Sequence, residues 1–169
     1  MFQEIGTTIA AEFSDLPDVA TITVITVRLV IAALLGGVLG YERERKARSA
    51  GVRTHMLVAV GAALFVLGPV QAGMEIADMS RVIQGVVQGI GFLGAGAIII
   101  RQSRHQVEGL TTAASIWATA GIGVIVGLGL EATAILSTVI VLIILAVVPI
   151  VVPQAALPRQ TEDETRRRS

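Results

Sequence analysis

The stretch that decides the fold is residues 109–130, GLTTAASIWATAGIGVIVGLGL, a run of 22 residues without a charge. Residues 54–74, 82–100 and 132–158 are equally free of charged residues, and in residues 19–41 only Arg28 interrupts a fifth run. A helix of about 20 residues crosses the roughly 30 Å hydrocarbon core of a bilayer. The sequence therefore predicts an all-α membrane protein with five transmembrane helices.

The composition agrees with this fold class. Hydrophobic residues make up 53% of the 169 residues and charged residues 15%, with a mean hydropathy of +0.76. Soluble domains carry about 25% charged residues, so the lipid bilayer is the first predicted partner. The runs are continuously apolar, which excludes an alternating membrane β-barrel. A formal net charge of zero argues against nucleic-acid binding, and the absence of cysteine excludes disulfides and thiolate metal sites.

The runs divide the chain into three parts. We expect an N-terminal amphipathic segment at residues 1–20, with a flexible tail as the alternative, because its apolar residues recur at steps of three and four. A transmembrane domain follows at 21–152, and a polar cytoplasmic tail at 153–169. The predicted spans are residues 21–40, 56–72, 82–100, 112–127 and 131–152.

Lysine and arginine predict the orientation of these spans. Eleven of the 13 basic residues lie in the loop after the first span, in the loop after the third span, or in the tail. The other two are Arg81, on the opposite side, and Arg28, inside the first span. The bias places the N-terminus outside and the C-terminus in the cytoplasm, in the inner membrane of a bacterium.

Arg28 is the charged residue whose position most needs a reason, because an arginine within a span costs about 2.5 to 3.5 kcal/mol on insertion scales. Gln88 on the third span reaches a similar depth, and Gln84 and Asp78 lie nearer the outer surface, with Arg81 beside them. One interpretation is a polar cluster that opens to the outside. The other is that Arg28 only extends its guanidinium to the membrane surface.

Polar residues also gather where the spans meet the cytoplasm. They could bind a partner at the membrane edge, or they could form a solvated loop that only sets the topology. The candidates are Glu42, Arg43, Arg53, Thr54, His55, Thr111, Thr112 and Ser115. His55 and His105 lack the spacing of a metal site, and no catalytic triad or phosphate loop is present. We therefore expect no enzyme and no catalytic, cofactor or metal site.

Glycines recur at helical spacing in three of the spans. Residues 89–94, GIGFLG, match a dinucleotide-binding motif, but no strand precedes them and the run is uncharged. Close helix packing is the better interpretation, whether within one chain or in a homo-oligomer. The predicted packing glycines are Gly36, Gly40, Gly85, Gly89, Gly91, Gly94, Gly96, Gly123 and Gly127.

Four blocks in this order resemble the MgtC/SapB family of bacterial inner-membrane proteins. They lie within residues 28–44, 50–58 (AGVRTHMLV), 89–96 (GIGFLGAG) and 109–117 (GLTTAASIW), and the resemblance covers about residues 24–129. It implies a small inner-membrane protein, linked in some members to survival in low magnesium, in acid or within host cells. Two departures bear on partner specificity: residues 78–81 read DMSR without the usual proline, and Glu108 stands where many members have a basic residue.

The resemblance further implies a regulator of partner membrane machinery, such as the ATP synthase or a transporter. The sequence prediction is therefore a non-enzymatic regulator that acts under magnesium limitation or related stress. The alternative is a transporter of magnesium or another ion, which would need oxygen ligands near the midplane. Spans 56–72, 82–100 and 112–127 contain no carboxylate. A purely structural oligomer is the third hypothesis.

Overall fold

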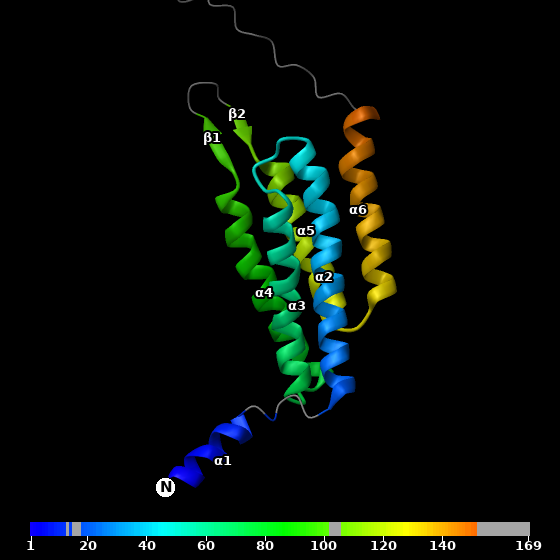
Figure 1. Ribbon diagram of the computed structural model, residues 1–169. Coiled ribbons are helices and arrows are strands. Elements are labelled where there is room, and N and C mark those ends of the chain that lie inside the picture. Colours follow the sequence, from blue (N-terminus) through cyan, green and yellow to red (C-terminus); the bar gives the residue numbers. More distant parts are fainter. Residues whose placement is uncertain (13, 15–17, 102–105, 152–169) are drawn as a thin grey trace, which may run out of the picture.

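The computed structural model describes residues 1–12, 14, 18–101 and 106–151. Within these ranges the helices are α1 (Phe2–Glu12), α2 (Val19–Arg45), α3 (Val52–Gln71), α4 (Ile76–Gly96), α5 (Leu110–Gly127) and α6 (Glu131–Val151). Strands β1 (Ile99–Arg101) and β2 (Gln106–Glu108) pair antiparallel, with Ile100 opposite Val107. Helices α2 to α6 run alternately up and down in one bundle (Figure 1).

Among the described helices, α2, α3, α5 and α6 are long and apolar enough to cross a membrane. The prediction of an all-helical membrane protein is confirmed at this level. Helix α4 also has 21 residues, but it contains Asp78, Arg81, two glutamines and five glycines, and it falls short of the apolar character of the other four. The expected fifth span depends on this helix.

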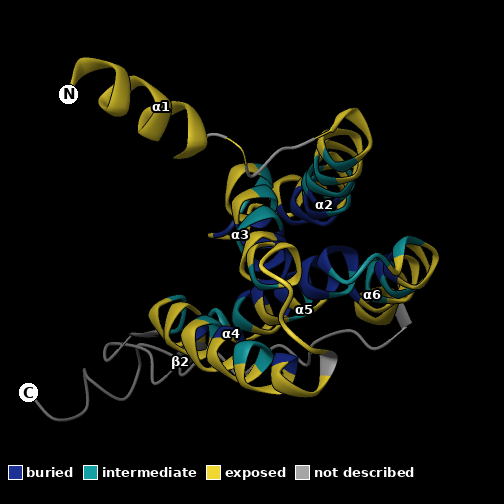
Figure 2. Ribbon diagram, turned by 90° about the horizontal axis from the view of Figure 1, so that it is seen from below, coloured by how far each residue is buried: buried dark blue, intermediate teal, exposed yellow. Residues whose placement is uncertain are grey.

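Helix α5 forms the centre of the bundle. It packs against α2, α3, α4 and α6, and more of its residues are buried than in any other described helix (Figure 2). Its sequence is apolar on every side, as expected for a helix enclosed by others. Ile122 and Val126 face one core cluster with Ala63, whereas Ile116 and Ala120 face a second with Val66.

The helices around the α2–α3 loop are longer than the predicted spans. Helix α2 continues five residues beyond Gly40, through residues with good helix propensity. Helix α3 begins at Val52, where the backbone N–H donates to the Glu44 carboxylate at 3.0 Å and so caps the helix. Consequently Arg43 and His55 lie inside helices, and the loop that was expected to hold them is reduced to six residues, 46–51.

The third predicted span is displaced along the chain. Helix α4 begins six residues before Val82 and ends at Gly96, and β1 occupies the expected last turn. Glycine-rich sequence disfavours helix continuation at this end. After the hairpin, Gly109 has a φ of +93° and approaches the Ala97 carbonyl so closely that a β-carbon would collide with it. Only glycine fits this turn into α5.

Helix α1 lies apart from the bundle and is exposed along its length (Figures 1 and 2). Helix α2 then begins with a capping carboxylate, since Asp18 accepts a hydrogen bond from the Thr21 N–H at 2.7 Å. This hydrogen bond lowers the pKa of Asp18 below its usual value. The tail predicted at 153–169 lies outside the described residues.

Candidate functional site

Four of the predicted packing glycines hold α3 between α2 and α5. A β-carbon on Gly36 would lie 2.9 Å from the Ala59 β-carbon, and one on Gly123 would lie 3.0 Å from the Ala59 α-carbon. Gly40 faces the backbone of Val52, and Gly127 faces Val66. At these glycines the backbones of α2 and α5 approach α3 to van der Waals distance, which holds the three helices rigidly together.

The glycines of α4 have a different environment. Gly94 makes ordinary van der Waals contact with Ala113 of α5. Among the described residues nothing would lie within 4 Å of a β-carbon on the remaining four, which are Gly85, Gly89, Gly91 and Gly96. These four positions leave space beside α4.

A buried arginine anchors the loop end of the bundle. The side chain of Arg43 is only 2% exposed. Its guanidinium pairs with the Glu42 carboxylate and donates to the Leu145 carbonyl oxygen of α6 at 3.2 Å. The Lys46 ammonium joins the same group, 2.7 Å from Glu42 Oε1 and 2.8 Å from the Leu145 oxygen. Two cations thus share one carboxylate and one carbonyl.

Pro149 explains why the Leu145 carbonyl accepts these bonds. In a regular helix that oxygen would accept from the N–H four residues later, but proline has no N–H to donate. The carbonyl would otherwise be unsatisfied inside the bundle, at a cost of several kcal/mol in a lipid environment. Arg43 and Lys46 take the place of the missing donor, and we call this group the carbonyl clamp.

A second buried polar contact joins α3 to α5. His55 is completely buried, its Nδ1 lies 3.0 Å from the Gly51 carbonyl oxygen, and its Nε2 lies 3.2 Å from the Ser115 hydroxyl. Because a carbonyl can only accept, Nδ1 carries a proton. In the neutral ring Nε2 is an acceptor, so the single proton of the Ser115 hydroxyl has two acceptors, Nε2 and the Thr112 carbonyl oxygen at 2.8 Å. Since His55, Ser115 and Thr112 are all buried, this group connects helices and presents no reactive atom to a substrate.

At the opposite end of α2, Arg28 contacts α5 and α6. Its Nη1 donates to the Gly127 carbonyl at 3.1 Å, and its Nε lies 3.6 Å from Glu131 Oε1. The guanidinium therefore satisfies the Gly127 carbonyl at the end of α5 and faces Glu131 in the first turn of α6. The structure does not bring Arg28 to Gln88, because α4 lies on the far side of α3 and α5 (Figure 2). Sequence reasoning did not pair Arg28 with Glu131, although Glu131 is the one charge at the α5–α6 join.

Removing either member of the Arg28–Glu131 pair should loosen the α5–α6 turn. We expect Arg28→Leu to lower the free energy of unfolding by about 1.5 to 3 kcal/mol, since hydrogen bonds to charged groups contribute in that range. Glu131→Gln should lower the free energy of unfolding by less, because the hydrogen bond from Arg28 to the Gly127 carbonyl remains. Denaturation of both single variants and the double variant in mixed micelles measures the coupling. Strict additivity of the two losses would mean that the pair does not interact.

The other candidate residues face outward. Arg53, Thr54 and Thr111 are exposed at the loop end of the bundle. Four candidates are exposed on α4, and they are Asp78, Arg81, Gln84 and Gln88. Within the described residues no three His, Cys, Asp or Glu side chains gather where they could hold a metal ion. Most of the candidates thus fall into two sets. Arg43, His55, Thr112 and Ser115 are buried between helices, whereas the candidates on α4 and at the loop end are exposed.

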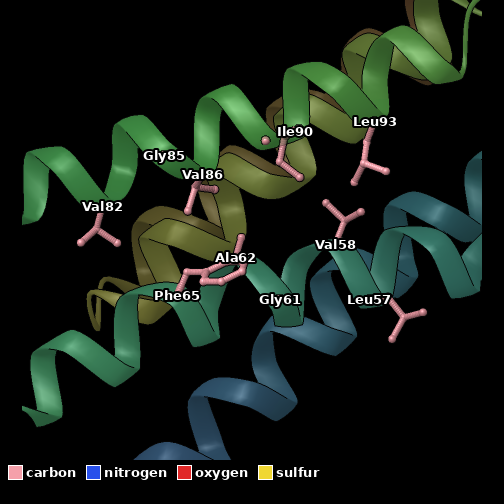
Figure 3. A pocket seen from close by; sticks show the side chains of 11 residues that line it. Leu57, Val58, Gly61, Ala62, Phe65, Val82, Gly85, Val86, Ile90 and Leu93 are labelled. Atoms are coloured by element: carbon pink, nitrogen blue, oxygen red, sulfur yellow. The ribbon is translucent and has the colours of Figure 1, made fainter.

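An apolar groove of about 590 Å³ separates α3 from α4 (Figure 3). Leu57, Ala62 and Phe65 line it from α3, whereas Val82 and Ile90 line it from α4. Three glycines widen it, and they are Gly61, Gly85 and Gly89. A second cavity of about 430 Å³ adjoins the groove at Val58 and Leu93 and contains two hydroxyl residues, Ser49 and Thr54. Sequence reasoning assigned Gly85 and Gly89 to close helix packing and did not single out Gly61, whereas in the structure all three face open space in the groove. The sequence does not reveal the groove, because it does not show how far apart α3 and α4 lie.

Known proteins are similar to this chain over about 70% of its length. SrpB of Synechococcus elongatus is 45% identical over 130 residues, which cover 70% of this chain and 71% of SrpB. The Escherichia coli K12 protein named "Putative magnesium transporter YhiD" is 39% identical over 128 residues, 72% of this chain and 59% of YhiD. MgtC of Salmonella typhimurium LT2 is 46% identical over 114 residues, 68% of this chain and 48% of MgtC. The chain thus spans less than two thirds of YhiD and of MgtC.

No solved structure matches the chain. The profile of the MgtC family, in contrast, matches residues 29–152, which include the glycine contacts, the carbonyl clamp and the groove. The match covers most of the chain and agrees with the resemblance found in the four sequence blocks. This membrane protein therefore belongs to the MgtC family.

Proposed function

We propose that the protein is a non-enzymatic regulator of the bacterial inner membrane that binds a partner membrane protein under magnesium limitation or related stress. Two glutamines on α4 carry this proposal. Gln84 and Gln88 are one turn apart on the exposed face, and no hydrogen bond joins either side chain to the described part of the chain. An amide side chain in hydrocarbon is stabilised when it forms a hydrogen bond with a polar group on another helix.

The same face of α4 has room for such a helix. Gly91 follows Gln84 and Gln88 at helical spacing and has open space where a side chain would stand. Small residues beside amides are typical of helix association in membranes. By resemblance, the partner is the ATP synthase or a transporter, and a second copy of the chain is the competing occupant of this face.

The proposal includes five spans, with α4 as the third. Helix α4 runs beside α3 and α5 in the bundle (Figure 1), and crossing the membrane there would place Gln84 and Gln88 in lipid unless a partner covers them. The distribution of basic residues then places the N-terminus outside and the C-terminus in the cytoplasm.

Cysteine labelling tests this topology, and the natural chain has no cysteine that would interfere. We expect Ser49→Cys, in the α2–α3 loop, to resist a membrane-impermeant thiol reagent in intact cells. Ala72→Cys, exposed beyond the end of α3, should react with it. Both variants should react after the membrane is permeabilised. Labelling of Ser49→Cys from outside would reverse the orientation.

Magnesium transport is the second candidate function, favoured by the name of YhiD. Magnesium prefers oxygen ligands in octahedral geometry. The groove instead presents apolar side chains and glycines. The buried Arg43 and the half-buried Arg28 are cationic and face carboxylates or carbonyls. This chemistry favours regulation over cation passage.

One experiment with two measurements separates the candidates. A photo-crosslinking residue at position 88 should capture a membrane partner in magnesium-limited cells, whereas the same residue at Ile143, exposed on α6, should not. The full-length chain in vesicles containing a magnesium-sensitive dye should give no flux above that of protein-free vesicles. Flux that exceeds this control would favour the transporter, and equal crosslinking at 88 and 143 would remove the α4 face as the docking surface.

A further inference from the structure

We propose that the groove between α3 and α4 binds one anionic phospholipid, with an acyl chain along the groove and the headgroup at the α2–α3 loop. The site is the pair of adjoining cavities, which share Val58 and Leu93. One end is apolar and the other holds hydroxyl groups, and this is the polarity of a lipid molecule.

The apolar part is built for a flexible hydrocarbon chain. Its walls are aliphatic and aromatic side chains, with glycines where either helix would otherwise project a side chain into the space (Figure 3). Gly61 on α3 and Gly85 and Gly89 on α4 each leave at least 4 Å clear in front of the missing β-carbon. Hydrocarbon that enters the groove fills this space and gains dispersion contacts with both walls.

The length of the groove matches one leaflet. From Thr54 to Phe65 the α3 wall extends over eleven residues, or about 16 Å at 1.5 Å per residue. The hydrocarbon of a single leaflet is about 15 Å thick, half of the roughly 30 Å core. A transmembrane helix from a partner needs a surface of the full thickness. The groove therefore fits an acyl chain better than a second helix.

The polar end supplies the charge for an anionic headgroup. Ser49 and Thr54 line the second cavity, and each directly follows an exposed arginine, Arg48 or Arg53. The two acidic residues at the end of α2 are engaged elsewhere, since Glu42 pairs with Arg43 and Lys46 while Glu44 caps Val52. Basic residues at the membrane surface attract anionic lipids by about 1 kcal/mol each. Hydroxyl and guanidinium groups together bind a phosphate.

Native mass spectrometry of the full-length chain tests the site. The chain is equilibrated in detergent with equal amounts of phosphatidylglycerol and phosphatidylethanolamine. We expect one retained phosphatidylglycerol per chain. At Gly85 and Gly89 a β-carbon would meet no neighbour within 4 Å, so the variant Gly85→Leu/Gly89→Leu should fold and lose at least fivefold in retained lipid. Gly61→Leu should act in the same way from the opposite wall.

Matched variants distinguish the parts of the site. Gly121→Leu adds the same side chain at an exposed, open position of α5 outside the groove and should retain lipid as the natural chain does. Arg48→Gln/Arg53→Gln should keep one lipid but lose the preference for phosphatidylglycerol, and Arg81→Gln at the other end should not. Unchanged retention in both groove-filling variants would overturn the proposal. A dimer that binds no lipid and dissociates when the groove is filled would assign the groove to a second copy.

Discussion

Gly123→Ala should destabilise the protein by more than the 1 to 3 kcal/mol that is typical of overpacking, at about the strength of the largest single-residue effects. The added methyl group would collide with the Ala59 carbonyl and lie 3.0 Å from its α-carbon. The obstacle is backbone, which no change of side-chain rotamer removes. Relief requires α3 and α5 to separate, and Gly36 on α2 is also so close to Ala59 that a β-carbon there would lie 2.9 Å from the Ala59 β-carbon.

For the control variant we expect a change in stability of the opposite sign. Gly121 lies two residues earlier on α5, is exposed and has nothing within 4 Å of a β-carbon. Gly121→Ala should stabilise the helix by about 0.8 to 1 kcal/mol, because alanine is the better helix former. Unfolding in mixed micelles, followed by circular dichroism, measures both changes. Similar stability of the two variants would show that α3 and α5 are not in backbone contact at Ala59.

Arg43→Met should lower the free energy of unfolding by about 3 to 5 kcal/mol, the range found when one partner of a buried ion pair is removed. The variant leaves Glu42 with Lys46 as its remaining partner and removes a donor from the Leu145 carbonyl. Arg45→Met is the matched control on the same helix. Arg45 is exposed and lies 6.0 Å from the centre of the Tyr41 ring, so its loss should cost about 1 kcal/mol or less.

A second substitution separates the carbonyl from the carboxylate. Pro149→Ala returns an N–H to α6 that can reach the Leu145 oxygen, and Arg43→Met should then cost less than it does in the natural sequence. We expect a coupling free energy of about 0.5 to 3 kcal/mol between positions 43 and 149. A coupling of zero in the double-mutant cycle would show that the missing proline donor is not what Arg43 replaces.

The sequence was sufficient to predict most of the fold because the membrane simplifies the problem. A charge-free run of about 20 residues has few structural alternatives in lipid, so α2, α3, α5 and α6 were predicted close to their observed places. The ends were harder to predict. Helix α2 extends to Arg45 and α3 starts at Val52 because Glu44 reaches across the loop, a contact between residues eight positions apart.

The candidate site was predictable in its residue types but not in its pairings. Arg28 was identified as a charge that needs a partner, yet depth along separate helices could not distinguish Gln88 from Glu131, since depth contains no information about which helices are neighbours. His55 was assigned to a loop and is buried in α3 against Ser115. Pro149 was a signal that could have been used, because a proline within a span marks the carbonyl four residues earlier as a free acceptor.

The carbonyl clamp also has a consequence for the order in which the chain assembles during synthesis. The donor Arg43 and the acceptor Leu145 are 102 positions apart, so the arginine leaves the ribosome long before its acceptor exists. At about 5 to 20 residues per second, the delay is roughly 5 to 20 seconds. Throughout that interval the loop end of α2 carries cations that headgroups or water must solvate. Insertion of α6 supplies the Leu145 carbonyl that replaces this solvation, so among the described helices the arrival of α6 is the step that completes the carbonyl clamp.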